Sequence, residues 1–206
     1  MGVYYLEIAK NNLRHNSLLS VIAAVILCLL VPLFIGTANL DKLSAAMPLE
    51  MFVSLIGVIL LTPVFGPEQN EEIRDLTAVK YFGIRKIYCI RTVYSAVIIV
   101  LLIGLFFIYM NIQNCEVTPM LAFGTIADAL FLGGMGMFVS AVSDNTVIGY
   151  MPPLFYYALN FGMGEKLGKF YLFSMAAGEY KAKLWMLAAG VLLIFAALFY
   201  QYVRRD

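Results

Sequence analysis

The clearest candidate for chemistry in this sequence is the stretch from Gly164 to Lys169, whose composition is close to that of a phosphate-binding loop. Such a loop needs glycines at fixed positions and a Ser or Thr after its Gly-Lys pair, because backbone N–H groups hold the phosphates and the hydroxyl binds magnesium. Here Met163 stands where a glycine is required, and Phe170 follows Lys169. We therefore do not predict a nucleotide site.

An acidic pair, Glu71 and Glu72, has the composition of a metalloprotease site but lacks its ligands. A zinc site of that kind needs histidines beside the carboxylate, and the only histidine, His15, lies outside any apolar stretch. The cysteines match no zinc or disulfide spacing: Cys28, Cys89 and Cys115. We predict a chain that is not an enzyme, has no catalytic residues and holds no metal or cofactor.

Two polar residues fall in apolar stretches and are candidates for a substrate or ion pathway, Asp128 and Asn160. In a helix that begins near Leu121, Asp128 would lie roughly 10 Å into the membrane, where an unpaired carboxylate is costly. Alternatively the apolar core starts at Ala129, and Asp128 is hydrated at the outer interface. We favour this alternative because no Lys or Arg lies within a predicted span to pair with it. Asn160 is more typical of a contact between helices.

The elements that must position these residues are set by an unusually apolar composition. The chain has 206 residues, of which 62% are hydrophobic and 13% charged, and its mean hydropathy is +0.86. A water-soluble domain of this size cannot bury so much apolar surface. The net charge of +1 gives no indication of a nucleic-acid partner. The sequence therefore predicts an integral membrane protein.

Apolar stretches of roughly 20 residues are long enough to cross a bilayer as helices, which satisfy their own backbone groups. We predict an all-α protein that forms a single domain over residues 1–206, with six spans. They are Leu18 to Ile35, Leu49 to Phe65, Thr92 to Tyr109, Leu121 to Val142, Val147 to Phe161 and Leu184 to Tyr200. The fifth is the weakest, because it is short and contains Pro152 and Pro153.

The positions of the arginines predict the orientation, since short loops rich in Lys and Arg stay in the cytoplasm. Six crossings place all of the following on one side: Arg14, Arg74, Arg85, Arg91, Arg204 and Arg205. On the opposite side, the positively charged residues are all lysines: Lys42, Lys166, Lys169, Lys181 and Lys183. Both termini are therefore expected in the cytoplasm.

The polar segment between the second and third spans is predicted to be helical and cytoplasmic. Asn70 can cap a helix whose first turn carries Glu71 and Glu72, and Gly83 can end it. A second helix from Ile84 then runs into the third span. The alternative is a solvated loop that obeys the charge rule, but this alternative does not explain the capped acidic start.

Two other segments are predicted to lie at membrane surfaces. Residues 1–16 contain polar and apolar faces at helical spacing, which indicates an interfacial helix on the inner leaflet; the alternative is a solvated lead-in to the first span. Residues 162–183 form an outer loop whose apolar part, residues 170–177, would lie on the outer leaflet or dip into it as a re-entrant segment.

A strip of small residues is predicted on one face of the fourth span: Gly133, Gly134, Gly136 and Ser140. Small residues let a neighbouring backbone approach closely, either within the chain or across a dimer. We favour packing within the chain.

Taken together, these features resemble those of the permeases of the ATP-binding-cassette type-2 transporter family, over the whole chain. The resemblance rests on the interfacial first helix, the acidic turn from Pro67-Glu68 to Glu72, and Gly83 to Ile87 leading to Arg91. It also rests on the glycine-rich stretch Gly133 to Ala141 and on the apolar outer segment. The sequence departs from the family at Asp144, where a basic residue is more usual.

The resemblance implies a transport subunit that works with partners. ATP and magnesium would bind to a separate ATPase subunit, and a second permease copy or a related permease would complete the pathway in a bacterial inner membrane. In the family the loop after the second span docks on the ATPase, which assigns residues 66–91 as a cytoplasmic coupling loop. The coupling residues would be Glu71, Glu72, Arg74, Leu76 and Gly83, with Glu68 as a weaker member.

The apolar membrane part suits export of a hydrophobic or amphipathic substrate such as a peptide, lipid or drug. One rival is the six-helix substrate-binding component of a vitamin-type importer, which docks through small residues such as Ser20 and Ala24 in the first span. Another rival is a non-transporting membrane protein that confers immunity or regulates by binding.

Overall fold

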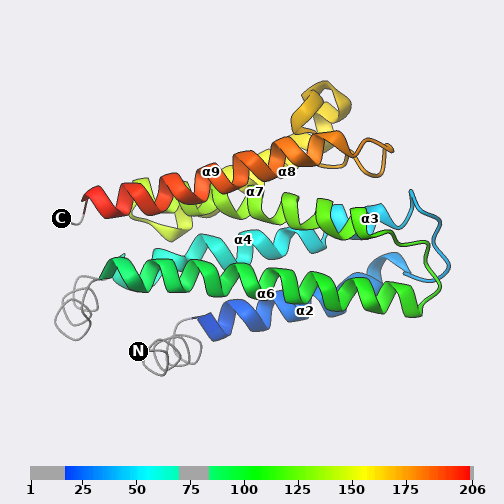
Figure 1. The fold of residues 1–206 in the computed structure, drawn as a ribbon, viewed down its shortest axis with the longest axis horizontal. Helices are drawn as coiled ribbons and strands as arrows, with labels where there is room; N and C mark the ends of the chain where they lie inside the picture. Colours follow the sequence, from blue (N-terminus) through cyan, green and yellow to red (C-terminus); the bar gives the residue numbers. More distant parts are fainter. Residues whose placement is uncertain (1–16, 70–83, 205–206) are drawn as a thin grey trace.

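A computed structural model describes residues 17–69 and 84–204 of the chain (Figure 1). The interfacial helix predicted in residues 1–16 and the coupling helix predicted in residues 70–83 lie outside the described residues. Every regular element within these two ranges is helical, which agrees with the predicted all-α class.

The elements follow the predicted order of apolar stretches. They are α2 (Leu18–Ile35), α3 (Ala46–Met51), η2 (Val53–Leu55), α4 (Ile56–Leu61), η3 (Thr62–Gln69), α6 (Ile84–Ile112), α7 (Pro119–Ser143), α8 (Thr146–Met163), η4 (Gly164–Phe170) and α9 (Lys181–Arg204). The second predicted span is thus built from the four short helical pieces α3, η2, α4 and η3. The short helix predicted from Ile84 and the third predicted span, Thr92 to Tyr109, form one helix, α6, which runs without interruption to Ile112.

Five helical stretches in the described residues are long and apolar enough to cross a membrane. They are Leu18–Ile35, Ala46–Gln69, Ile87–Ile112, Pro119–Ser143 and Lys181–Arg204, and they support a membrane-embedded protein. Helix α8 has 18 residues but is not among these stretches. Its polarity is raised by Pro152, Pro153 and Asn160. The fifth predicted span, and with it the total of six crossings, therefore stays a prediction.

The long helices lie side by side and run in alternating directions, so that their ends gather at the two ends of the bundle (Figure 1). The first, which we call the termini end, holds the start of α2, the end of η3, the start of α6 and the end of α9. The second, the connector end, holds the connections of residues 36–45, 113–118 and 164–180. The segment that follows α8 projects beside the start of α9 at this end.

Helix α7 lies at the centre of the packing, against α4, α8 and α9. A Cβ atom at Gly133 would lie 2.4 Å from the Gly57 carbonyl oxygen of α4, and one at Gly134 would lie 2.7 Å from the Gly190 oxygen of α9. The predicted strip of small residues is thus used inside the chain. Ser140 is fully buried as well. Close approach of backbones is what places the side chains of different helices within reach of one another.

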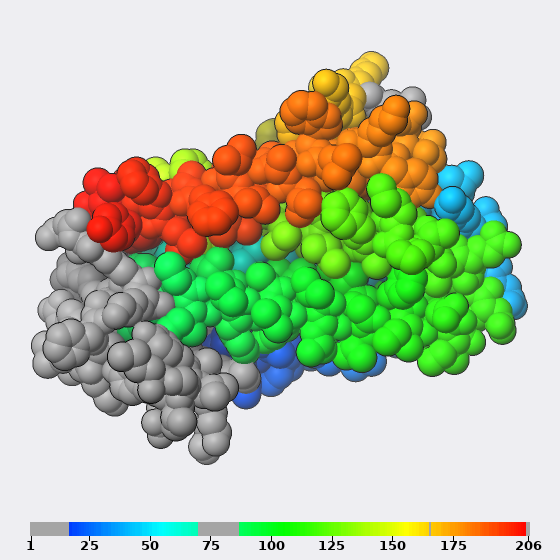
Figure 2. All heavy atoms as spheres, in the orientation of Figure 1, coloured from blue at the N-terminus to red at the C-terminus, as the bar shows by residue number. Residues whose placement is uncertain are grey.

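The outer helices α2, α6 and α9 expose mainly apolar side chains. In α2 only Ala24 and Val31 are buried, whereas Leu19 and Leu33 are each 79% exposed. Helices α6 and α9 fill much of the face seen in Figure 2. Over its length, α9 exposes large apolar residues: Leu184, Trp185, Leu192, Phe195 and Phe199. Surfaces of this kind are stable against lipid and not against water.

Candidate functional site

The connector end contains a non-helical segment that is buried in the protein. Residues 171–178, which we call the capping segment, lie in the connection between η4 and α9. Four of them in a row are almost inaccessible: Leu172, Phe173, Ser174 and Met175. A buried loop exposes backbone N–H and C=O groups that have no helical partner, and each must be satisfied by other means. Side chains from α3, α8 and α9 supply these partners.

Glu50 of α3 accepts two hydrogen bonds from the backbone of the capping segment. Its side chain is fully buried. Oε1 accepts a hydrogen bond from the Met175 N–H at 2.8 Å, and Oε2 accepts one from the Ala176 N–H at 3.0 Å. Hydrogen bonds from backbone N–H groups to a carboxylate are among the strong ones in proteins. Glu50 therefore fixes the middle of the capping segment to α3.

Asn160 of α8 fixes the start of the same segment. Its Oδ1 accepts a hydrogen bond from the Leu172 N–H at 2.8 Å, and its Nδ2 donates to the Tyr156 carbonyl at 2.8 Å. The residue is 1% exposed. Both ends of the amide are thus used within the protein, and Asn160 ties α8 to the capping segment.

Lys183 of α9 joins these groups into a network. Its Nζ lies 2.6 Å from Glu50 Oε1 and 2.6 Å from Asp128 Oδ2 of α7, and it donates to the Leu172 carbonyl oxygen at 2.5 Å. We call Glu50, Asp128 and Lys183 the charged triad. All three side chains are completely buried, so the triad is shielded from the solvent that weakens ion pairs at a surface.

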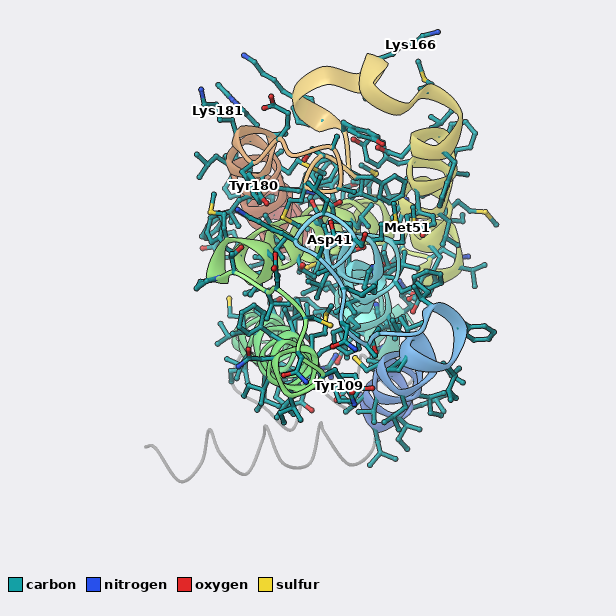
Figure 3. The ribbon with its side chains drawn as sticks, turned by 90° about the vertical axis from the view of Figure 1, so that its right-hand side faces the viewer. Asp41, Met51, Tyr109, Lys166, Tyr180 and Lys181 are labelled. Carbon is teal, nitrogen blue, oxygen red and sulfur yellow. The ribbon has the colours of Figure 1, made fainter. Side chains whose placement is uncertain are left out.

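A glycine makes room for the lysine. A Cβ at Gly124, one turn before Asp128 on α7, would lie 3.2 Å from Lys183 Cγ and 2.3 Å from the Met175 sulfur. The aliphatic stem of Lys183 therefore passes over a position without a side chain. Figure 3 looks onto the connector end and shows Lys181, two residues earlier on α9, pointing away from the bundle.

The prediction of a hydrated Asp128 at the start of a helix is wrong. Helix α7 begins at Pro119, well before Asp128, and the carboxyl group is inaccessible and paired with Lys183. The prediction failed because Lys183 was assigned to a solvated outer loop, whereas α9 begins two residues before it. The pathway role considered for Asp128 and Asn160 stays a prediction.

At the termini end the residues just before the predicted coupling helix make a second buried ion pair. Glu68 of η3 and Arg91 of α6 pair through two bonds, 2.6 Å from Nη1 to Oε2 and 2.7 Å from Nη2 to Oε1. Arg91 Nη1 also donates to the Val64 carbonyl oxygen at 3.2 Å. The Phe65 and Tyr88 rings pack edge to face beside them, with centroids 4.9 Å apart. These contacts join the end of η3 to the start of α6.

The sequence suggested that Glu68 is a weaker docking residue, but the structure places its side chain inside the protein. It is 0% exposed, and both of its carboxylate oxygens are used by Arg91, so no partner can contact it. The other predicted coupling residues lie outside the described residues: Glu71, Glu72, Arg74, Leu76 and Gly83.

Gln69, the last residue of η3, extends this junction to two more helices. Its Oε1 accepts hydrogen bonds from the N–H and the hydroxyl of Thr146, at 2.9 and 2.7 Å, and its Nε2 donates to the Ser140 hydroxyl at 3.3 Å. Thr146 begins α8, and Ser140 lies in the last turn of α7. We call Glu68, Gln69 and Arg91 the junction.

Sequence reasoning missed Glu50 and Lys183, the two residues that complete the triad. A signal for both was present. Glu50 is the second residue of the predicted second span, and Lys183 immediately precedes the sixth. The predicted topology puts both on the same side of the membrane as the start of the fourth span, so opposite charges were available there for Asp128.

Comparisons of the chain with protein-family models, with curated proteins and with solved structures gave no match.

Proposed function

We propose that this chain is the membrane-spanning permease subunit of an ATP-driven exporter in a bacterial inner membrane, with six spans and both termini in the cytoplasm. ATP and magnesium bind to a separate ATPase subunit. Two permease copies, or this chain and a related permease, enclose the pathway. The substrate is hydrophobic or amphipathic, such as a peptide, a lipid or a drug.

The observation that carries this proposal is the junction at the termini end. Residues 70–83 follow the end of η3, one residue after Glu68, and precede the start of α6, seven residues before Arg91. Glu68 and Arg91 form a bidentate ion pair at 2.6 and 2.7 Å. The segment proposed to dock on the ATPase therefore starts and ends on helices that are fixed to each other.

This arrangement suits a transmitter of force. A displacement of residues 70–83 would move the end of η3 and the start of α6 together, because a buried Arg–carboxylate pair is rigid and geometrically specific. Gln69 would pass the displacement to the start of α8 and the end of α7 through Thr146 and Ser140. Four helices would thus respond as packed elements with defined contacts.

The importer rival receives less support from the described residues. Docking through the first span would need Ala24 on the surface, but Ala24 is fully buried within the chain. The immunity or regulatory rival makes a different prediction for the partner, because such a protein has no need of an ATPase.

The proposal is tested by purifying the full-length chain from its native membranes in mild detergent and measuring the ATP hydrolysis that copurifies. The variant with Glu71→Lys and Glu72→Lys reverses the acidic start of the proposed docking helix. A matched control with Glu116→Lys and Glu179→Lys makes the same charge change at two exposed glutamates of the connector end.

We expect ATP hydrolysis to copurify with the wild-type chain and with the control, and to be lost from the Glu71/Glu72 variant while equal amounts of that variant remain in the membrane. Hydrolysis that is absent from the wild-type preparation, or unchanged in the Glu71/Glu72 variant, would overturn the assignment of residues 70–83.

A further inference from the structure

The charged triad has one negative charge more than it can balance. Two carboxyl groups, Glu50 and Asp128, share a single ammonium group, Lys183, and these are the only charged groups among the described residues that interact with Asp128. With all three ionised the site would carry a net charge of −1 in a place from which solvent is excluded. Buried charges that are not compensated are expensive, and such groups tend to become neutral by taking or losing a proton.

The surroundings of Lys183 identify it as charged. Three oxygens lie around its Nζ, those of Glu50, Asp128 and Leu172, at 2.5 to 2.6 Å. An ammonium group has three N–H donors and no acceptor, so the number of oxygens matches the protonated form. Neutral lysine would have a lone pair directed at one of these oxygens. Lys183 therefore contributes its full positive charge, and the surplus negative charge has to be removed at one of the two carboxyl groups.

The two carboxyl groups differ sharply in their surroundings. Glu50 interacts with Lys183 and accepts two backbone hydrogen bonds, from Met175 and Ala176. Asp128 receives one hydrogen bond, from Lys183 to Oδ2, while its Oδ1 is buried and has no partner. Several hydrogen bonds stabilise a carboxylate in its charged form. A bare, buried oxygen is far less costly on a neutral acid than on a carboxylate.

We propose that the charged triad is a proton-binding site and that the proton resides on Asp128 Oδ1. In this state Glu50 is negative, Lys183 is positive, and Oδ2 of the neutral acid accepts the hydrogen bond from the ammonium group. The proposal stands independently of the exporter assignment. Other titratable neighbours leave the balance unchanged, because Tyr156 of α8 carries no charge and its hydroxyl donates to the Phe170 carbonyl.

Loss of this proton would act on the capping segment. The O–H bond of Asp128 would break, the proton would pass to water, and the second carboxylate would compete with Glu50 and the Leu172 carbonyl for Lys183. A hollow of 610 Å³ lies next to the segment and is lined by Ser174 and Ala182, the neighbours in sequence of Met175 and Lys183. We expect the proton to exchange with water from this hollow when the segment loosens.

The direct test is infrared spectroscopy of the purified full-length chain in lipid, in which a protonated carboxylic acid has a carbonyl-stretching band that a carboxylate lacks. We compare the wild type with Asp128→Asn and Glu50→Gln, because each variant removes one of the two acids and is close in size to the wild type. We expect a band at neutral pH in the wild type that disappears as the pH rises and that is missing in both variants, because each variant leaves one carboxylate for one ammonium group. In wild-type protein whose aspartate side-chain carboxyl groups carry carbon-13, we expect this band to shift to lower frequency.

A band that does not shift when the aspartate carboxyl groups carry carbon-13 would overturn the assignment to Asp128. Equal spectra for all three proteins at neutral pH would overturn the site itself.

A second measurement tests the consequence for the capping segment and needs no spectroscopic assignment. In a background without native cysteines, the thiol-labelling rate of Ser174→Cys is divided by that of Ala177→Cys, since Ser174 is buried and Ala177 is exposed. We expect this ratio to rise with pH by up to about tenfold per pH unit, the limit for the loss of one proton, and to stay flat when Asp128→Asn is added. A ratio in the wild-type background that does not change with pH would overturn the proposal.

Discussion

Two buried ionic sites at opposite ends of the bundle differ in how their charges are matched. At the termini end one carboxylate and one guanidinium of the described residues meet through two bonds, so these two charges balance each other and both partners fix the geometry. At the connector end two carboxyl groups meet one ammonium group, and one carboxyl oxygen is left without a partner. Burial alone therefore does not define what an ionic site does.

The difference has a physical meaning. A balanced bidentate pair has no low-energy alternative, because breaking it leaves a bare charge in the interior. Such a pair suits a junction that must transmit displacement without deforming. A site with a surplus carboxyl group has two states that differ by one proton, and the charge of the interior changes between them. The first kind of site makes a rigid link, and the second kind can respond to conditions.

The largest effect on stability is expected from removing the ammonium group of the charged triad. Replacing Lys183 by Met leaves Glu50, which accepts hydrogen bonds from two backbone N–H groups, without its counter-ion. We expect a loss of about 5 kcal/mol in the free energy of unfolding, near the upper limit for removing one partner of a buried ion pair. The measurement is equilibrium unfolding in mixed detergent micelles.

The matched control is Lys181→Met, which removes a lysine from the same helix at an exposed position. It should leave the unfolding free energy nearly unchanged, because exposed charges contribute little. Similar losses for the two variants would show that burial of the triad has no energetic weight.

The balanced pair should respond somewhat less to a single change. Arg91→Met leaves Glu68 buried without a partner, but the Arg91 side chain is 11% exposed, so water reaches the edge of the pair. We expect a loss of about 3 kcal/mol. The double variant Glu68→Gln with Arg91→Met removes both charges and should recover a large part of that loss, as measured in a double-mutant cycle. Additive losses in the cycle would contradict a direct pair.

The smallest of the three effects concerns the packing that brings the charged groups together. Gly57→Ala places a Cβ 1.8 Å from the Ala129 carbonyl oxygen, so α4 and α7 must move apart. We expect a loss of about 1 to 3 kcal/mol, typical of overpacking. Gly104→Ala is the control, since no atom lies within 4 Å of its Cβ position and alanine is the better helix former. A stability gain in both variants would contradict the close contact of α4 with α7.

Helix positions followed well from apolar length, because hydrophobicity and helix formation act locally along the chain. Helix α2 spans Leu18–Ile35, as predicted, and α7 extends the predicted fourth span by a few residues to Pro119–Ser143. The second span was less predictable. The apolar pattern does not predict its break into four helical pieces, because the pattern is continuous. Pro48, Pro63 and Pro67 lie in the observed stretch Ala46–Gln69 but do not mark where each piece ends.

The buried charges were the part that sequence reasoning could not place. Lys183 and Glu68 each sit at the edge of an apolar stretch, where a charge usually contacts water. Whether such a residue is solvated or buried depends on which helices meet there, and that is decided by contacts between positions 23 to 133 residues apart, such as Glu68 with Arg91 and Glu50 with Lys183. The capping segment was predicted to be apolar and at a surface, but its burial under side chains of three helices required the tertiary structure.

The proposed function requires that residues 70–83 face the same compartment as the C-terminus and that the connector end faces the other. It is tested most directly by labelling single cysteines with a membrane-impermeant thiol reagent in intact and opened cells, after replacing the three native cysteines. Glu71→Cys and Asp206→Cys should react only after the cells are opened, whereas Glu116→Cys should react in intact cells. Labelling of Glu71→Cys in intact cells would contradict the account, because an ATPase in the cytoplasm could not then reach this segment.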